Sequence, residues 1–238
     1  MSAKESLPAI AGWRWVTGGF AVLRRAPAAW LLVTALLVTL ALASTLLPAM
    51  GAVLLYVASP GLLAGALLGC KSLVASGVME PQCLVAGFRS HLRPLLRLGL
   101  VYTTAQILLL LLATAGGGVL PGLTPPGVAP PPPDADALPW MLAALLLSVP
   151  LTLLMWFAPA LVVLRDMAVW PAMRYSMAAC LFHWKACLVN GIVMSVLLLL
   201  ATLPMMLGLL LWVPLMVCSL YAAYAEVFGD PVTADLRR

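Results

Sequence analysis

The sequence predicts an all-α, polytopic membrane protein with six transmembrane helices, forming one integral-membrane domain over residues 1–238. Of its 238 residues, 64% are hydrophobic and only 9% are charged, and the mean hydropathy is +1.09. A soluble domain carries about a quarter charged residues, because its surface faces water. The apolar residues form runs of roughly the 20 residues that a spanning helix needs. The basic residues cluster between alternate runs, which fits a chain that crosses the membrane repeatedly.

Residues 28–70 predict the first two spans. This apolar stretch is interrupted only around Pro48. As one helix it would be roughly 60 Å long, about twice the thickness of the hydrocarbon core. The stretch must therefore turn back on itself. We expect a helical hairpin with spans at 28–47 and 51–70.

Four further spans complete the prediction. Proline and glycine mark their limits, because neither residue continues a helix well. Pro150 and Pro159 should bend the fourth span, and Pro204 divides the long apolar stretch near the C-terminus. The expected ranges are 98–115, 140–164, 186–203 and 205–224.

Segment 116–139, between the third and fourth spans, is rich in proline and glycine. Residues 130–133 are consecutive prolines, so this segment should sample extended polyproline II conformations and not a helix. Such segments can bind aromatic grooves of partner proteins, but a spacer is their commoner meaning. We expect a proline-rich loop on the outer side of the membrane.

The basic residues orient the predicted spans. All 13 lie before the first span, after the last, or in the connections between spans two and three and between spans four and five. Basic residues accumulate on the cytoplasmic side of a membrane. Both termini should therefore be cytoplasmic, with Arg25, Arg93 and Lys185 at the cytoplasmic interface. The net charge of +5 is then explained by topology and not by nucleic-acid binding.

The first span also resembles a secretory signal peptide. Arg24 and Arg25 precede an apolar stretch, and Ala41-Leu42-Ala43 imitates a cleavage site. The basic region is too long for a signal peptide, however, and the apolar run continues past the site. We expect an uncleaved span.

Each basic segment contains an amphipathic stretch just before an odd-numbered span. Apolar residues recur there every three or four positions, as on one face of a helix that lies in the membrane interface. The predicted stripes are Trp13, Val16, Phe20 and Leu23; Leu84, Phe88, Leu92 and Leu95; and Trp170, Met173, Met177, Leu181 and Trp184.

These three stretches align with one another. Phe20, Phe88 and Cys180 stand at equivalent positions, each five residues before a basic residue. The second interval exceeds the first by about the length of the Gly/Pro-rich loop. The alignment predicts three repeats, each an interfacial helix followed by a hairpin of two spans.

Gly61, Gly65 and Gly69 lie on one face of the second span. Small residues every four positions let helix backbones approach closely, either in a dimer or within one bundle. With five other spans available, we expect helix packing within the chain. The oligomeric state stays open.

Gln106 and Asn190 are the candidate residues of a polar path through the membrane. Amide side chains within spans can equally form hydrogen bonds between helices, at about 0.6 kcal/mol each. No Asp, Glu, Lys or Arg lies near the middle of a predicted span. Because ion and proton pathways usually need such residues, this pattern weighs against a pump or a coupled transporter.

No pattern in the sequence predicts an enzyme, a metal site or a cofactor. The five cysteines show no CxxC or Cys/His spacing and read as small apolar residues. His91 and His183 are expected to be interfacial side chains. Glu226 and Asp230, at the end of the last span, are candidate partners of Arg165 or Arg174.

Four segments carry a resemblance to known proteins. They are AGFRSHLRPLLRLG (86–99), WFAPALVVLRD (156–166), SMAACLFHWKACLVNG (176–191) and SLYAAYAEVFGD (219–230). In this order they resemble an uncharacterised bacterial family of BPSS-type membrane proteins of the inner membrane. The resemblance covers nearly the whole chain except the proline-rich loop. It implies a polytopic inner-membrane protein and supplies no catalytic residues.

Two classes of function follow from the sequence. The first is a non-catalytic membrane module that interacts with the bilayer's lipids or with partner membrane proteins. The second is a small transporter or permease-like protein whose path lies near Gln106 and Asn190. The lack of ionisable residues within the predicted spans favours the first class.

Overall fold

The computed structural model describes residues 6–47, 50–79, 82–115, 137–203 and 207–229, and within these ranges every regular element is an α-helix. The all-α prediction is confirmed. In chain order the helices are α1 (Ile10–Leu23), α2 (Pro27–Ser44), α3 (Met50–Ser76), α4 (Cys83–Thr114), α5 (Ala137–Trp156), α6 (Ala158–Arg165), α7 (Val169–Phe182), α8 (Trp184–Thr202) and α9 (Leu209–Phe228).

Within the described ranges, six helical segments are long and apolar enough to cross a membrane, as predicted. They are α2, α3, the part of α4 from His91 onward, α5 together with α6, α8 and α9. Pro48, Pro204 and most of the proline-rich segment lie outside the described residues.

The limits of the spans differ from those expected by a few residues, most in α3 and α4. α3 continues to Ser76, so Lys71 lies inside a helix and not in a connection. The helix ends at Gly77, whose φ of 74° is the left-handed conformation that glycine adopts without strain. α4 joins the amphipathic stretch to the third span in one helix, with a kink at His91 (φ −136°, ψ 40°) just before Pro94. The kink falls inside the predicted amphipathic stretch, between Phe88 and Leu92.

The fourth span is broken where the sequence predicted a bend. It begins at Ala137 and divides at Phe157 into α5 and α6. Pro159, at the start of α6, has no N–H to donate to the preceding turn, so the helical hydrogen bonding stops there. The Oγ of Ser176 in α7 accepts the free N–H of Phe157 at 2.9 Å. The N–H left free at the break therefore finds its acceptor in a second helix, α7.

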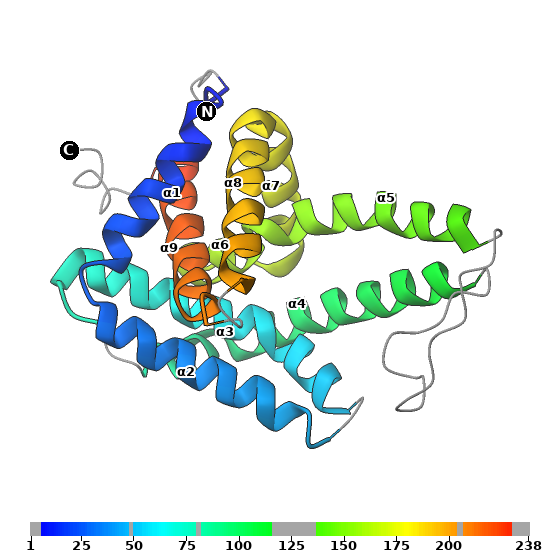
Figure 1. Cartoon of the computed structure of the whole chain (residues 1–238), viewed down its shortest axis with the longest axis horizontal. Coiled ribbons are helices and arrows are strands. Elements are labelled where there is room, and N and C mark those ends of the chain that lie inside the picture. The colour runs from blue at the N-terminus through cyan, green and yellow to red at the C-terminus, as the bar shows by residue number, and fades with distance from the viewer. Residues whose placement is uncertain (1–5, 48–49, 80–81, 116–136, 204–206, 230–238) are drawn as a thin grey trace.

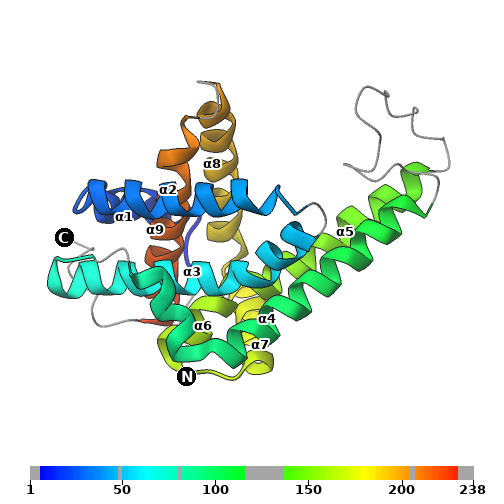
Figure 2. The ribbon, with the colours of Figure 1, turned by 90° about the horizontal axis from the view of Figure 1, so that it is seen from below.

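The most extensive packing between two helices is that of α3 on α4. α2 also packs on α3, α4 on α5, and α8 on α9. α1 packs on α8 and α9, α7 packs on α5 and α6, and α3 packs on both α6 and α9. Figures 1 and 2 show the α4–α5 pair projecting from the rest of the molecule, and α8 running in a different direction from α2.

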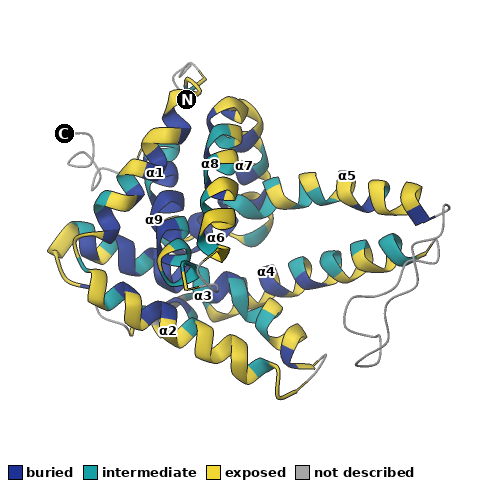
Figure 3. Cartoon of the chain, in the orientation of Figure 1, coloured by how far each residue is buried: buried dark blue, intermediate teal, exposed yellow. Residues whose placement is uncertain are grey.

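Burial is concentrated in one part of each span (Figure 3). In α3 the buried residues other than Gly51 lie between Pro60 and Leu73, and in α9 they begin at Pro214. The largest fully buried side chains include Trp15, Trp30, Phe157, Tyr221 and Tyr224. The helices thus share one core, while much of α2, α5 and α8 exposes apolar side chains outward.

Candidate functional site

Helix α1 packs deeply between the chain's last two helices. A Cβ atom built on Gly12 would lie 2.7 Å from the backbone nitrogen of Asn190 in α8, and one on Gly19 would lie 2.5 Å from the backbone nitrogen of Ser219 in α9. Both distances are too short for a real side chain, so only glycine permits this approach. Trp15, between the two glycines, is 1% exposed.

The predicted apolar stripes divide between an inner and an outer face. Their buried members are Val16, Leu23, Leu84, Leu95 and Met173. Their exposed members are Trp13, Phe20, Leu92, Trp170, Leu181 and Trp184. The inner face of α1 contains Gly12, Trp15 and Gly19. The spacing of Gly12 and Gly19, about two helical turns, is the sequence signal that could have identified this face.

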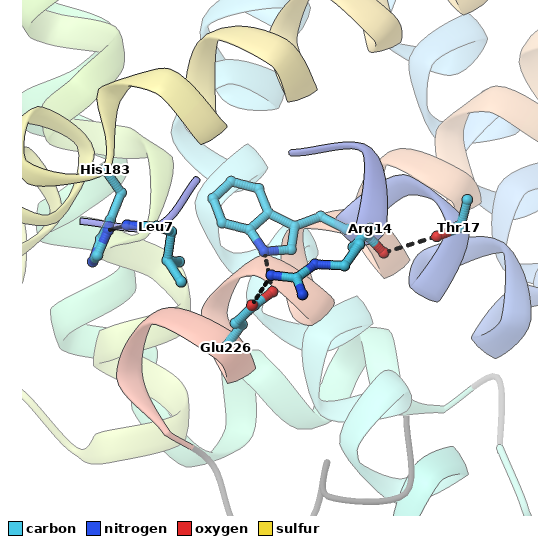
Figure 4. Close-up of polar contacts among 6 residues, drawn as sticks. Leu7, Arg14, Thr17, His183 and Glu226 are labelled. Carbon is cyan, nitrogen blue, oxygen red and sulfur yellow. Dashed lines mark hydrogen bonds and ion pairs between the residues drawn. The ribbon is translucent and has the colours of Figure 1, made fainter. Parts of the chain in front are cut away.

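The carboxylate of Glu226, near the end of α9, joins α9 to α1 (Figure 4). Arg14 Nη2 donates to Oε1 at 2.8 Å, and Trp15 Nε1 donates to Oε2 at 2.8 Å. The side chain of Glu226 is 19% exposed, against 53% for Arg14. The suggested pairing of Glu226 with Arg165 or Arg174 is therefore wrong: its partner comes from the docked α1, whose position the sequence did not predict. Asp230 lies outside the described residues.

Arg165 instead joins the end of α6 to α9. Its Nε donates to the hydroxyl of Tyr224 at 3.2 Å, and its Nη2 donates to the carbonyl oxygen of Phe228. The guanidinium carbon also lies 5.7 Å from the centre of the Phe228 ring, which is a cation–π contact. One arginine thus holds the last turn of α9 through three different interactions.

The two histidines also join separate segments. His91 Nε2 and Asp166 Oδ1 lie 2.5 Å apart, which links the kink in α4 to the residue after α6. Asp166 has a φ of 52°, a left-handed conformation in which aspartate is one of the commoner non-glycine residues. Nδ1 of His183, between α7 and α8, accepts the backbone N–H of Leu7 at 3.0 Å (Figure 4).

The three glycines predicted to lie on one face of the second span, Gly61, Gly65 and Gly69, face the beginning of α4. A Cβ built on Gly65 would lie 2.6 Å from the carbonyl oxygen of Leu84, and one on Gly69 would lie 2.8 Å from the sulfur of Cys83. Gly61 faces the ring of Phe88. The glycines therefore lie where α3 and α4 of the same chain meet.

The structure places Gln106 and Asn190 on different helices, α4 and α8. Gln106 Nε2 donates to the hydroxyl of Tyr102, one turn earlier in α4, at 2.9 Å. Asn190 is 3% exposed, and its Oδ1 accepts a hydrogen bond from Ser219 Oγ at 2.9 Å, joining α8 to α9. No hydrogen bond among the described residues connects the two amides.

The predicted interface residues Arg25, Arg93 and Lys185 are all exposed. Lys185 Nζ lies 5.8 Å from the centre of the Trp184 ring. The guanidinium of Arg24, beside Arg25, lies 5.1 Å from the centre of the Phe20 ring. Basic and aromatic side chains therefore occur together on the exposed faces of these segments.

A groove of about 660 Å³ lies between the end of α3 and the beginning of α4. It is lined by Leu68, Ser72, Ser76, Val78, Gln82, Cys83, Val85 and Arg89. Burial raises the pKa of the half-buried Cys83 thiol to about 11, with a further contribution from nearby Cys70. At neutral pH this thiol is protonated and weakly nucleophilic.

No family model matches the chain, and no solved structure matches it. Over 245 aligned residues the chain is 28% identical to a protein of Burkholderia thailandensis named as a probable inner membrane protein, and the alignment covers 92% of this chain and 91% of that relative. The resemblance to the BPSS-type family stays a prediction. The relative and the six apolar helices together identify a helical protein of the inner membrane.

Proposed function

We propose that the chain is a non-catalytic module of the inner membrane that interacts with lipids or with partner membrane proteins. In this proposal it consists of three repeats, each a surface helix followed by a hairpin of two spans. The surface helices are α1, the part of α4 before the His91 kink, and α7. The hairpins are α2–α3, the rest of α4 with α5–α6, and α8–α9.

Equivalent positions of the first two surface helices make equivalent contacts, which supports the repeat. Gly19 and Gly87 directly precede the two phenylalanines that align in the sequence. A Cβ on Gly87 would lie 2.7 Å from the backbone nitrogen of Gly65 in α3, just as one on Gly19 would meet Ser219 in α9. In each case the surface helix contacts the second span of the preceding repeat.

The third surface helix follows the same pattern. Ser176 of α7 lies one helical turn before the aligned Cys180. Its Oγ donates to the carbonyl oxygen of Leu153 at 2.7 Å and accepts the N–H of Phe157, so it holds the broken second span of the middle repeat. Because α1 packs on α9 in turn, the three repeats close into a ring.

The observation that carries the proposal is that the surface helices have two apolar faces. One face packs into the ring. The other stays exposed, and in α1 and α7 it carries large aromatic side chains: Trp13 is 50% exposed and Trp170 is 66% exposed. Arg24 and Lys185 lie beside exposed aromatic rings on these segments. Tryptophan and basic residues are the side chains enriched at the boundary between hydrocarbon and lipid head groups.

The exposed faces can be tested without knowing a partner. We would purify the protein in a mild detergent and identify the bound lipids and proteins by native mass spectrometry. Replacing Trp13, Trp170 and Trp184 by alanine should remove bound lipid or protein, whereas replacing Leu145 and Leu199, which are exposed within spans, should not. A protein that binds neither lipid nor partner, or that responds equally to both sets, would exclude the proposal.

The proposal also places both termini in the cytoplasm, because the basic segments follow the positive-inside rule. Reporter domains fused to each terminus test this directly. A reporter that works only in the cytoplasm should be active at both termini. A reporter active on the outer side at either end would contradict this orientation.

A further inference from the structure

We propose that the groove between α3 and α4 binds the head group of an anionic glycerophospholipid, of which phosphatidylglycerol is the simplest probe. This inference rests on the proposed function and names one lipid class for one site. The groove is formed where α3 ends and α4 begins, beside the predicted cytoplasmic interface.

The lining changes from apolar to polar along α3. On α3, Leu68, Ser72 and Ser76 follow one another at intervals of four residues, which places them on one face. Leu68 lies within the apolar span, and the two serines lie toward its end. A lipid whose acyl chains lie along the span and whose head group lies at its end matches this order.

The polar lining matches a phosphate that bears a glycerol group. Arg89 is exposed, and its guanidinium can donate two hydrogen bonds to one phosphate. The hydroxyls of Ser72 and Ser76 already donate to the carbonyl oxygens of Val78 and Ser72, so their oxygens remain available to accept hydrogen bonds from glycerol hydroxyls. The groove thus presents donors and acceptors in the combination that this head group needs.

Charge favours an anionic lipid over a neutral one. Among the described residues that line the groove, Arg89 is the charged one and none is acidic. α4 begins at the groove, and its first backbone N–H groups add positive potential to that of Arg89. The apolar side chains of Leu68, Val78 and Val85 distinguish a lipid from free phosphate, because they offer contact to acyl chains.

The test compares lipid binding by the full-length protein and two arginine variants. Delipidated protein in mild detergent would be titrated with phosphatidylglycerol, with phosphatidylcholine and with inorganic phosphate, and the bound species counted by native mass spectrometry. Arg89→Gln should weaken phosphatidylglycerol binding about tenfold, as expected for a lost charge-assisted hydrogen bond. Arg93→Gln, four residues away and outside the groove lining, measures the general effect of losing one interfacial charge and should weaken binding clearly less than Arg89→Gln does.

Each outcome decides the question. Arg89→Lys keeps the charge and should retain part of the affinity, which separates a local binding effect from misfolding. Equal binding by Arg89→Gln and Arg93→Gln, equal affinity for phosphatidylcholine, or displacement of the lipid by inorganic phosphate would overturn the inference. If phosphatidylglycerol binding survives Arg89→Gln while lipid is lost from the tryptophan variants, the groove fails and the proposed function stands. If the unchanged protein binds neither lipid nor partner, both fail.

Discussion

The indole N–H of Trp15 donates to the carboxylate of Glu226 at 2.8 Å, across 211 positions of the sequence. This hydrogen bond joins the first helix of the chain to the last. The interface between α1 and α9 thus combines the close backbone packing of Gly19 on Ser219 with a partly buried polar contact. In the proposed three-repeat architecture, this interface closes the ring.

Losing the hydrogen bond of the buried Trp15 indole should destabilise the protein more than losing the ion pair of the exposed Arg14. Trp15→Phe removes a hydrogen bond to a charged group and should lower the free energy of unfolding by about 1.5–3 kcal/mol. Arg14→Gln removes an ion pair whose arginine is 53% exposed and should cost less than about 1 kcal/mol. Unfolding of both variants in detergent with added SDS measures the difference. A larger loss for Arg14→Gln would contradict the geometry of this interface.

Two neighbouring glycines offer a matched comparison of close packing. An alanine at Gly19 would place its Cβ 2.5 Å from the backbone of Ser219, whereas one at Gly18 would meet Ala222 Cβ at an ordinary 3.6 Å. Gly19→Ala should therefore destabilise the protein by about 1–3 kcal/mol. Gly18→Ala should be neutral or slightly stabilising, because alanine favours the helix. Similar thermal stability of the two variants would show that α1 does not dock as described.

The break in the fourth span depends on one hydroxyl. Ser176→Ala leaves the buried N–H of Phe157 without its acceptor, at an expected cost of about 1–3 kcal/mol. Ser148→Ala is the control, because its exposed hydroxyl donates to Leu145 within the same helix. Thermal unfolding in detergent compares the two. Equal midpoints would mean that Ser176 does not support the break.

The raised pKa of Cys83 predicts how its alkylation depends on pH. A thiol with a pKa of about 11 has roughly a hundredfold less thiolate at pH 8 than one with the ordinary pKa of 9.0. In a variant that keeps Cys83 and replaces the other four cysteines, the rate of iodoacetamide labelling should rise about tenfold per pH unit up to pH 10. A plateau near pH 9 would indicate an ordinary, solvated thiol.

The same shift has a consequence for stability. The folded protein holds the Cys83 proton more tightly than the unfolded chain does, so its contribution to stability is present below about pH 9 and is lost as the pH rises toward 11. The free energy of unfolding of this variant, measured as the pH is raised from 9 to 11, should fall accordingly.

The apolar helices were predictable because their cause is local. Run length and composition decide whether a segment can span the membrane, and the charges between runs confirm the count without reference to tertiary contacts. Pro159 likewise predicted a disturbance of the fourth span. The disturbance is a full break at Phe157. This break depends on Ser176 in another helix, so the local sequence does not predict it.

The position of α1 was not predictable by the same reasoning. An apolar stripe beside basic residues indicates an interfacial helix, but within a membrane protein a helix can bury one apolar face in protein and turn another toward lipid. The stripe predicted around Trp13 and Phe20 identified the outward face. The inward face depends on Gly12 and Gly19, whose meaning becomes clear only beside α8 and α9.

The central claim, that α1 docks on α9 and closes the ring, can be tested by one engineered disulfide. A Cβ on Gly18 lies 3.6 Å from that of Ala222, within the range of natural disulfides. With the five native cysteines replaced by alanine, Gly18→Cys with Ala222→Cys in isolated membranes should oxidise to an intramolecular disulfide. Gly191→Cys with Ala222→Cys should not, since nothing lies within 4 Å of a Cβ on Gly191. Absence of the first disulfide, or disulfides formed only between chains, would contradict the account.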